Sequence, residues 1–426
     1  VLSRVEKERA FAAAALEAAA RGADPRDAAL ATELVYGVYR ARPWLDHLLD
    51  GASRNGKLEV DPLTRDALRV AAYQLAFLDR VPAHAVLSEA VSEIGRARGK
   101  GLAGFANAVL RKLAGDRVSL APPDPTGAAD PALALGLPSW LFERLAAAHG
   151  RDRAVAMGRA FNGPSRRTLR INTARIDIER AKERLGAGAK DGLYLPWALD
   201  AQDRKTAREL EEEGLAAHQD EGAGLVVAAL DPKSGERILD ACAGRGGKTA
   251  LMAQLSGGAS IEACDLQANK LERLSFELRR QGFEARTAAC DLAKGPLPFE
   301  GFFDRVLVDA PCTGTGTLGR RPEIRWRLRP EDIASLAQIQ RAMLGNAAAL
   351  VRPGGRLVLA VCSVLKEEHV DHLAPFLAAH PDFALVEKKP ALWPASIDWK
   401  GGAPLVDPGT SRTDGYGILC LERVAG

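Results

Sequence analysis

Apolar residues recur at helical spacing through the first quarter of the chain. The pattern is clearest over residues 28–39 and 68–75, and alanine is abundant throughout. Residues 24–25 and 61–62 each place an Asp-Pro pair near a helix start, where the missing N–H of proline costs nothing. We predict an all-helical domain over residues 1–115.

The pattern changes between residues 116 and 218. Residues 116–138 have no period and are rich in proline, glycine and aspartate, which is typical of a linker. We predict a small α+β subdomain over residues 139–218. It would contain helices at residues 139–149 and 176–185 and strands at residues 166–172 and 193–199. The first strand is basic, with Arg166, Arg167 and Arg170, and is either a contact surface for an acidic partner or a solvated face.

From residue 219 to 426, strand-like and helix-like segments alternate, which indicates a mainly parallel, Rossmann-like sheet covered on both faces. We predict strands at residues 237–242, 260–265, 284–288, 305–309, 356–361, 384–387 and 417–421. Helices are predicted at residues 222–230, 247–255, 268–281, 330–351 and 367–379.

Composition narrows the class of protein. A chain of 426 residues with 47% hydrophobic and 27% charged residues predicts a soluble protein of several domains. No apolar run is long enough for a membrane span, and the charged N-terminus does not resemble a signal peptide. The six cysteines form no C-x-x-C pair, so we expect no structural metal, no disulfide framework and a cytoplasmic location. A net charge of +3 permits a nucleic-acid partner through local patches.

A glycine-rich turn follows the first predicted strand of the sheet. Residues 238–249 read ILDACAGRGGKT, so a strand ends on Asp240 and a glycine-rich loop leads into a helix. Glycines there let the backbone approach a ligand, and a helix N-terminus offers free N–H groups. The spacing differs from that of a phosphate-binding P-loop.

Acids end the strands that follow. Asp265, Asp291 and Asp309 each stand at or just after the end of a predicted strand. An acid at the second strand accepts hydrogen bonds from ribose hydroxyls, and the acid after the third could reach an adenine amino group. These features predict an adenosine-containing cofactor but do not choose between NAD and S-adenosylmethionine.

Two cysteines stand at the same predicted edge. Cys312 lies in DAPC and Cys362 in VCS, each after a buried strand. A free cysteine is often only a small buried apolar residue, and we interpret Cys264, Cys290 and Cys420 in that way. Cys312 and Cys362 are better explained as reactive thiols beside a ligand. The basic segment with Arg320, Arg321, Arg325 and Trp326 is a candidate RNA contact.

The motifs DACAGRGGKT, DAPCTGTGTLGRRPEIRW and VCS resemble the Sun/Fmu (RsmB/NOP) family of RNA cytosine-5 methyltransferases. The phrases ATELVYGVYR, VPAHAVLSEAV and GFANAVLRKL in the first 115 residues resemble a NusB-like RNA-binding domain. The resemblance covers nearly the whole chain. It implies S-adenosylmethionine as cofactor and RNA as partner, most readily ribosomal RNA in an unassembled or partly assembled small subunit, and we expect a monomer.

The resemblance also assigns roles to residues. It implies Cys362 as the nucleophile that adds to C6 of cytosine, Asp309 as the acid that contacts the base, and Cys312 as the thiol that assists release. The predicted cofactor-binding residues are Cys242, Ala243, Gly244, Arg245, Gly246, Gly247, Lys248, Asp265, Asp291 and Asp309. The thiolate must be stabilised, because an ordinary thiol is only a few per cent ionised at neutral pH. Arg320, Arg321 and Lys248 are candidate cations for this role.

The chain departs from the family pattern at Gly244-Arg245, at Val361 and at residues 367–369, which read EEH. A non-catalytic RNA-binding or ribosome-assembly factor is the main alternative. An NAD-dependent enzyme would not explain two thiols, and an adenine-directed methyltransferase would need no thiol.

Overall fold

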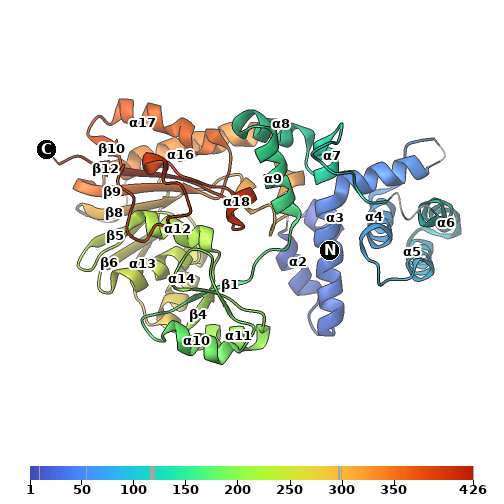
Figure 1. Ribbon diagram of the computed structural model, residues 1–426, viewed down its shortest axis with the longest axis horizontal. Coiled ribbons are helices and arrows are strands. Elements are labelled where there is room, and N and C mark those ends of the chain that lie inside the picture. Colours follow the sequence, from blue (N-terminus) through green and yellow to red (C-terminus); the bar gives the residue numbers. More distant parts are fainter. Residues whose placement is uncertain (9, 54, 116–119, 296–297, 299, 426) are drawn as a thin grey trace. The chain divides into compact units, whose positions relative to one another are not determined.

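The computed structural model describes residues 1–8, 10–53, 55–115, 120–295, 298 and 300–425 (Figure 1). By its contacts the chain divides into two compact units. The N-terminal unit comprises Val1–Gly163 together with Leu318–Arg327. The C-terminal unit comprises Pro164–Thr317 and Leu328–Gly426. The multidomain fold class predicted from the sequence is confirmed.

The N-terminal unit is helical, as predicted. Its helices are α1 (Leu2–Lys7), α2 (Ala12–Ala19), α3 (Pro25–Ala52), α4 (Pro62–Phe77), α5 (Ala83–Arg98), α6 (Lys100–Gly115), α7 (Pro131–Leu135), α8 (Ser139–His149) and α9 (Arg151–Asn162). The two Asp-Pro starts are confirmed, because the Asp24 and Asp61 carboxylates accept backbone N–H groups of the first turns of α3 and α4. Helix α7 lies inside the stretch that the sequence suggested was only a linker.

A segment that comes much later in the sequence, Leu318–Arg327, completes this unit. Helix α15 (Ile324–Arg327) carries Arg325, which is 1% exposed. Its guanidinium donates to the carbonyl oxygens of Gly136 at 3.0 Å and Phe161 at 2.9 Å, and to the side-chain oxygen of Asn162 at 2.9 Å. The indole N–H of Trp326 donates to the carbonyl of Tyr39. Arg325 is therefore buried inside the N-terminal unit and is not available for the predicted RNA contact.

The C-terminal unit begins with a small antiparallel sheet of strand order β2-β3-β1-β4. Its elements are β1 (Thr168–Ile171), α10 (Ile178–Leu185), β2 (Lys190–Asp191), β3 (Ala198–Asp200), α11 (Arg204–Glu212) and β4 (Ala216–His218). The predicted strand at residues 193–199 is wrong over its first part. The backbone N–H groups of Leu193, Tyr194 and Leu195 donate to the Glu221 carboxylate, so they are not available to a strand ladder.

The main sheet has the strand order β10-β12-β9-β8-β5-β6-β7, with β11 paired to β12. The strands are β5 (Arg237–Asp240), β6 (Ser260–Asp265), β7 (Arg286–Ala289), β8 (Phe303–Asp309), β9 (Val351–Val361), β10 (Phe383–Leu385), β11 (Leu405–Val406) and β12 (Tyr416–Arg423). Strands β5 to β9 pair in parallel, while β10 and β12 pair antiparallel. The strand order reverses between β5 and β8, which is where open α/β sheets bind ligands.

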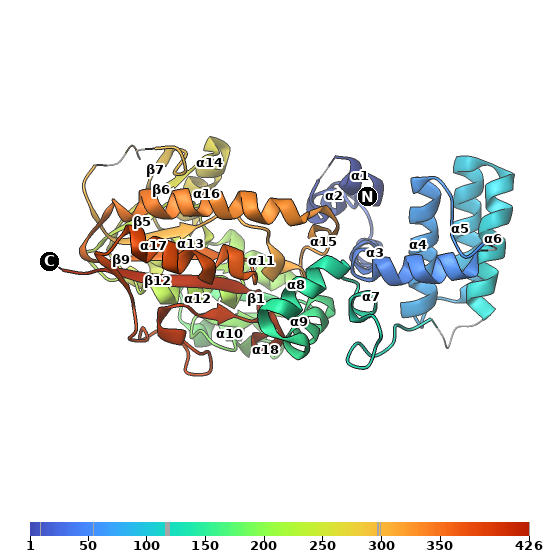
Figure 2. The ribbon, with the colours of Figure 1, turned by 90° about the horizontal axis from the view of Figure 1, so that it is seen from above.

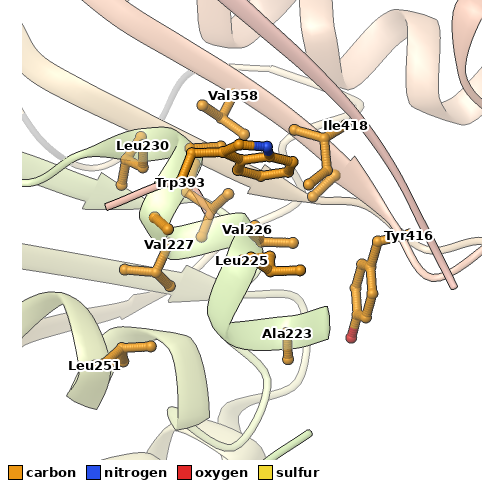
Figure 3. Close-up of a cluster of buried hydrophobic side chains, with 14 of the residues drawn as sticks. Ala223, Leu225, Val226, Val227, Leu230, Leu251, Val358, Trp393, Tyr416 and Ile418 are labelled. Carbon is orange, nitrogen blue, oxygen red and sulfur yellow. The ribbon is translucent and has the colours of Figure 1, made fainter. Parts of the chain in front are cut away.

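Helices cover both faces of this sheet, as the alternation predicts. Helices α12 (Glu221–Leu230), α13 (Gly247–Ser256) and α14 (Ala268–Gln281) lie on one face, and α16 (Pro330–Ala348) and α17 (Leu373–Ala379) on the other (Figures 1 and 2). Figure 3 shows the core beneath α12, where Leu225, Val226 and Leu230 pack against Val358, Trp393 and Ile418. The opposite core joins Val306 and Val308 to Met343, Leu344 and Phe376. Alternate residues of each strand thus fill the two cores.

Two predicted helices are shorter than expected. Helix α16 ends at Ala348, and the following strand begins already at Val351. Residues 366–372 form two 3-10 turns, η3 (Lys366–Glu368) and η4 (Val370–His372), before α17. The backbone of His369 (φ −127°, ψ −101°) breaks the helical path, because Glu368 and His369 are both turned into the core.

Candidate active site at the carboxyl edge of the sheet

The register of the parallel strands brings the predicted site residues to one edge. Asp309, the last residue of β8, pairs with Ala360 of β9, so the loops carrying Cys312 and Cys362 leave the sheet side by side. Asp240 at the end of β5 pairs with Leu307, two residues before Asp309. Strand pairing therefore brings together residues that are far apart in the sequence, at the edge where their strand-end positions predicted them.

Asp309 forms an ion pair with Lys248 from the first turn of α13. The Lys248 Nζ and Asp309 Oδ2 atoms are 2.6 Å apart, and the ammonium lies 5.2 Å from the centre of the Tyr416 ring. Burial acts to lower the pKa of Lys248, but the charge of Asp309, the neighbouring Tyr416 and the hydrogen bond to Asp309 act together with Cys362 to raise this pKa overall. A permanently charged lysine therefore holds one oxygen of the Asp309 carboxylate.

The two predicted thiols are in direct contact. The Sγ atoms of Cys312 and Cys362 are 3.2 Å apart, and both residues are half-buried free cysteines. The hydrogen bond with the Cys362 sulfur, followed by burial, raises the pKa of the Cys312 thiol well above its ordinary value. The raised pKa keeps the Cys312 thiol protonated at neutral pH.

A buried carboxylate that sequence reasoning did not assign holds the Cys312 loop. Glu368 accepts the backbone N–H of Thr313 at 2.9 Å and the Thr313 hydroxyl at 2.5 Å. The Gln340 amide donates to the same carboxylate at 3.1 Å and to the carbonyl of Pro311 at 2.9 Å. The only signal in the sequence was the acidic pair after Cys362, in a segment predicted as plain helix.

The glycine-rich turn has the geometry that close approach of a ligand requires. Gly244 (φ +55°) and Gly246 (φ +85°) both occupy the left-handed region, and a Cβ at Gly246 would lie 2.7 Å from Leu274. The Asp265 carboxylate accepts the N–H groups of Gly244 at 3.0 Å and Gln267 at 2.9 Å. The β6 acid therefore fixes the loop as well as ending its strand.

The remaining predicted cofactor-binding residues surround this turn. Ala243 is buried, Cys242 and Asp291 are half-buried, and Arg245 and Gly247 are exposed. Burial raises the pKa of the Cys242 thiol, which keeps it neutral. The Asp291 carboxylate accepts the N–H of Ala293 at 3.1 Å and lies 3.3 Å from Lys294 Nζ. Arg320 and Arg321, predicted as candidate cations near the thiols, belong by their contacts to the N-terminal unit.

The described residues contain no cluster of three or more His, Cys, Asp or Glu side chains that could hold a metal ion. No helix among them is long and apolar enough to cross a membrane.

Three family models match the chain in succession. Residues 1–115 match the NusB family, residues 137–201 a ferredoxin-like domain of RsmF/B-like methyltransferases, and residues 227–418 the 16S rRNA methyltransferase RsmB/F. These matches agree with the helical, small α+β and Rossmann-like parts described above.

Individual relatives match over most of their length. A probable ribosomal RNA small subunit methyltransferase B of Bacillus subtilis is 35% identical, covering 83% of this chain and 80% of that one. The ribosomal RNA small subunit methyltransferase B of Vibrio cholerae is 34% identical, covering 96% and 92%. The crystal structure of PH0851 superposes with a TM-score of 0.77 at 28% identity, covering 94% of this chain and 91% of that one.

Proposed function

The chain belongs to the RsmB/F family of 16S rRNA methyltransferases, and from this premise we propose that it methylates C5 of a cytosine in small-subunit ribosomal RNA. It is a methyltransferase with S-adenosylmethionine as cofactor. The observation that carries the proposal is the pair of thiols, Cys312 and Cys362, in contact at 3.2 Å on the sheet edge that also presents Asp309. Only a reaction that forms and breaks a bond to the base needs two thiols there.

Cys362 is the nucleophile in this proposal. C5 of cytosine reacts poorly with electrophiles until a thiolate adds to C6 and converts the ring into an enamine. Because the pKa of Cys312 is raised, its thiol stays protonated, and at 3.2 Å it stands where it can donate to a Cys362 thiolate as that anion forms. The Lys248 ammonium, one ion pair away through Asp309, adds positive potential at the same edge.

Asp309 is the acid that contacts the base in this proposal. As sulfur adds to C6, negative charge develops on the ring. Asp309 relieves this charge by holding a proton at N3 of the base. General acid help of this kind is worth roughly 10²–10⁴-fold. Lys248 fixes Asp309 Oδ2, so the carboxylate is already oriented before the base enters. After methyl transfer the C5 proton leaves to a base, and Cys312, whose thiol lies against the Cys362 sulfur, assists cleavage of the bond between that sulfur and C6.

The residues at the glycine-rich turn fit S-adenosylmethionine. Gly244 and Gly246 leave no side chain between backbone and ligand, and Asp265 at the end of β6 is suited to ribose hydroxyls. Asp291 follows β7 and is suited to the adenine amino group. The cofactor supplies an electrophilic methyl group beside the base. Free cysteines and a ribosomal RNA substrate favour the cytoplasm as the location.

Nucleoside analysis tests the proposal. Protein-free 16S rRNA is incubated with enzyme and S-adenosylmethionine, digested, and analysed by mass spectrometry. We expect 5-methylcytidine with the wild type and none with Cys362→Ala, which should retain its affinity for the cofactor in calorimetry. Cys420→Ala is the matched control, because that thiol is buried against α12 on a different part of the sheet. A methyl group on another nucleoside, or turnover by Cys362→Ala, would contradict the proposal.

A further inference from the structure

A basic cavity lies beside the candidate active site, within the C-terminal unit. It has a volume of about 720 Å³ and opens between the small antiparallel sheet, helix α14 and the glycine-rich turn. Its lining includes Arg170, Arg208, Arg245, Arg273, Phe276 and Arg280. Of these side chains only Arg245 was among the predicted cofactor-binding residues, and the mechanism above gives the others no role.

Positive charge in the cavity exceeds negative charge. Five arginines line it against three glutamates. Arg208 pairs with Glu212 at 2.8 Å and Arg280 with Glu277 at 2.5 Å. In the part of the chain that the structure describes, Arg170, Arg245 and Arg273 have no carboxylate within ion-pair distance. The net excess favours an anionic ligand.

Arg170 is a buried cation held only by neutral groups. It is 2% exposed, and its guanidinium donates to the side-chain oxygens of Gln254 at 2.7 Å and Gln281 at 2.5 Å. Its Nε has no hydrogen-bond partner, and neither does Nη1 of Arg280 in the same lining. Burial lowers the pKa of Arg170 to about 10, so it stays charged at neutral pH. Buried charges are ordinarily paired, so the Arg170 guanidinium, which has no carboxylate partner in the described part of the chain, favours an anion in the adjoining cavity.

The walls of the cavity are fixed to each other. Asn172 at the end of β1 donates to the carbonyl oxygens of Gly214 at 3.0 Å and Gln281 at 2.8 Å. The Gln254 amide donates to the carbonyl of Ile171 at 2.9 Å. These bonds join the small sheet to α13 and α14, so the arginines are held in place before any ligand binds.

An exposed aromatic ring stands in the same lining. Phe276 is 60% exposed on α14, and Arg273 and Arg280 lie three and four residues away on the same helical face. Exposed aromatic rings among arginines are the arrangement that binds single-stranded nucleic acid, with phosphates on the cations and a base stacked on the ring. A small inorganic anion would not require the phenyl group.

We propose that this cavity binds single-stranded RNA next to the target cytosine, with a phosphodiester against the arginines and a base on Phe276. The proposal rests on the proposed function and extends its substrate site. The chain itself connects the two places: Gly247 lines the cavity, and the next residue, Lys248, holds Asp309. The N-terminal turn of α13 adds N–H groups that favour phosphate.

The test uses three variants of α14 in the full-length protein. Arg273→Ala and Phe276→Ala remove the cation and the ring, and Arg279→Ala removes an exposed arginine that does not line the cavity. The probe is a fluorescent single-stranded RNA of about 12 nucleotides, titrated at several salt concentrations. S-adenosylmethionine and sodium phosphate are titrated separately by calorimetry.

We expect Arg273→Ala to weaken RNA binding and to reduce the slope of log affinity against log salt by about 0.7. Phe276→Ala should weaken binding about fivefold or more with the slope unchanged, because stacking carries no charge. Arg279→Ala should bind RNA like the wild type, and all three variants should bind the cofactor normally.

Three results would overturn the proposal. RNA affinity could be unchanged in Arg273→Ala and Phe276→Ala, or lost equally in Arg279→Ala. Alternatively, the variants could lose affinity for sodium phosphate or the cofactor alone, which would assign the cavity to a small anion. RNA binding is measured without turnover, so a wild type that binds as predicted but makes no 5-methylcytidine would refute the proposed function and leave this site standing.

Discussion

Glu368 connects the two cysteine loops through a single buried carboxylate. It follows Cys362 in the chain, yet its oxygens bind Thr313, the residue after Cys312. The network continues through Gln340 to His372, whose pKa burial lowers to about 4 so that the ring is neutral. The distance between the two sulfurs therefore depends on a residue that touches neither of them.

Glu368→Gln should slow catalysis because Glu368 holds the loop that carries Cys312 in position. The amide oxygen of a glutamine can take the place of Oε1, which accepts from the Thr313 N–H and from Gln340, but an NH₂ group would replace Oε2 and face the donating Thr313 hydroxyl. An unsatisfied buried donor costs on the order of 1–3 kcal/mol, so we expect that loss in unfolding free energy together with a slower single-turnover methylation. Glu367→Gln, at the half-buried neighbour, is the control. Wild-type stability and rate in Glu368→Gln would rule out the positioning role.

The raised pKa of the Asp240 carboxyl group predicts that the stability of the protein depends on pH. Its carboxylate is buried under the site and accepts the Thr249 hydroxyl at 2.7 Å, and burial raises its pKa to about 7. Because the folded protein keeps this proton between about pH 4 and pH 7 while the unfolded chain has lost it, raising the pH through this window removes stability.

The size of the Asp240 effect is on the order of 1 kcal/mol per pH unit. The asparagine in Asp240→Asn cannot titrate. The free energy of unfolding of this variant in urea should therefore increase relative to that of the wild type as the pH rises from 5 to 7. Taking the difference in unfolding free energy between the two proteins at each pH removes the contribution of the other titratable groups. Parallel stability curves would show that Asp240 does not titrate in this range.

The sequence located the candidate site residues at one edge of the sheet but could not predict their surroundings. Asp309, Cys312 and Cys362 could be chosen because an acid and thiols stood at the ends of buried strands. The sequence could not separate the arginines of the basic strand: Arg166 is neutralised by Asp200 and Glu221, both at 2.7 Å, whereas Arg170 is buried and lines the basic cavity. Which charges find partners depends on tertiary pairing, and no local pattern records it.

At the scale of elements, helix α15 belongs to a unit from which it is distant in sequence. Residues 318–327 lie in the motif stretch that begins with Asp309 and Cys312, but Arg325 and Trp326 pack within the N-terminal unit. Gly136 (φ +62°) at the end of α7 packs so closely on α3 that a Cβ there would clash with the carbonyl oxygen of Arg40, and its own carbonyl accepts from Arg325.

Arg325→Ala should loosen the N-terminal unit. It removes the donors to the carbonyls of Gly136 and Phe161, at a cost on the order of 1–3 kcal/mol per buried acceptor left without a partner. Hydrogen exchange should accelerate in α7 and α9 while β8 and β9 keep their protection. Arg321→Ala, at an exposed position in the same segment, serves as the control. Equal exchange in α7 and α9 of both variants would show that Arg325 does not support this unit.

Long periodic elements were predicted well and irregular ones were not. Helices α8 and α14 begin and end at the predicted residues, because their apolar spacing is continuous. The turns η3 and η4 interrupt a sequence with helical spacing, since Glu368 and His369 bind Thr313 and the carbonyl of Ile418. Hydrogen bonds to distant partners overrode local preference there.

At the scale of the whole molecule, the alternation of strands and helices predicted the mainly parallel sheet, while its strand order and the switch point between β5 and β8 come from the structure. The resemblance to the RsmB/NOP family added the NusB-like part. The pattern could not show that α8 and α9 group with the N-terminal unit or that the chain re-enters that unit at Leu318. Such groupings depend on contacts between residues far apart in sequence.

The covalent bond between Cys362 and RNA is the most direct consequence of the two-thiol site. It can be measured by incubating Cys312→Ala with 16S rRNA and S-adenosylmethionine, digesting both polymers and identifying the cross-linked peptide by mass spectrometry. We predict a stable adduct of a methylated cytidine on the peptide that contains Cys362, and its absence in Cys312→Ala/Cys362→Ala. No adduct in the single variant, or an adduct on another residue, would contradict the proposed mechanism.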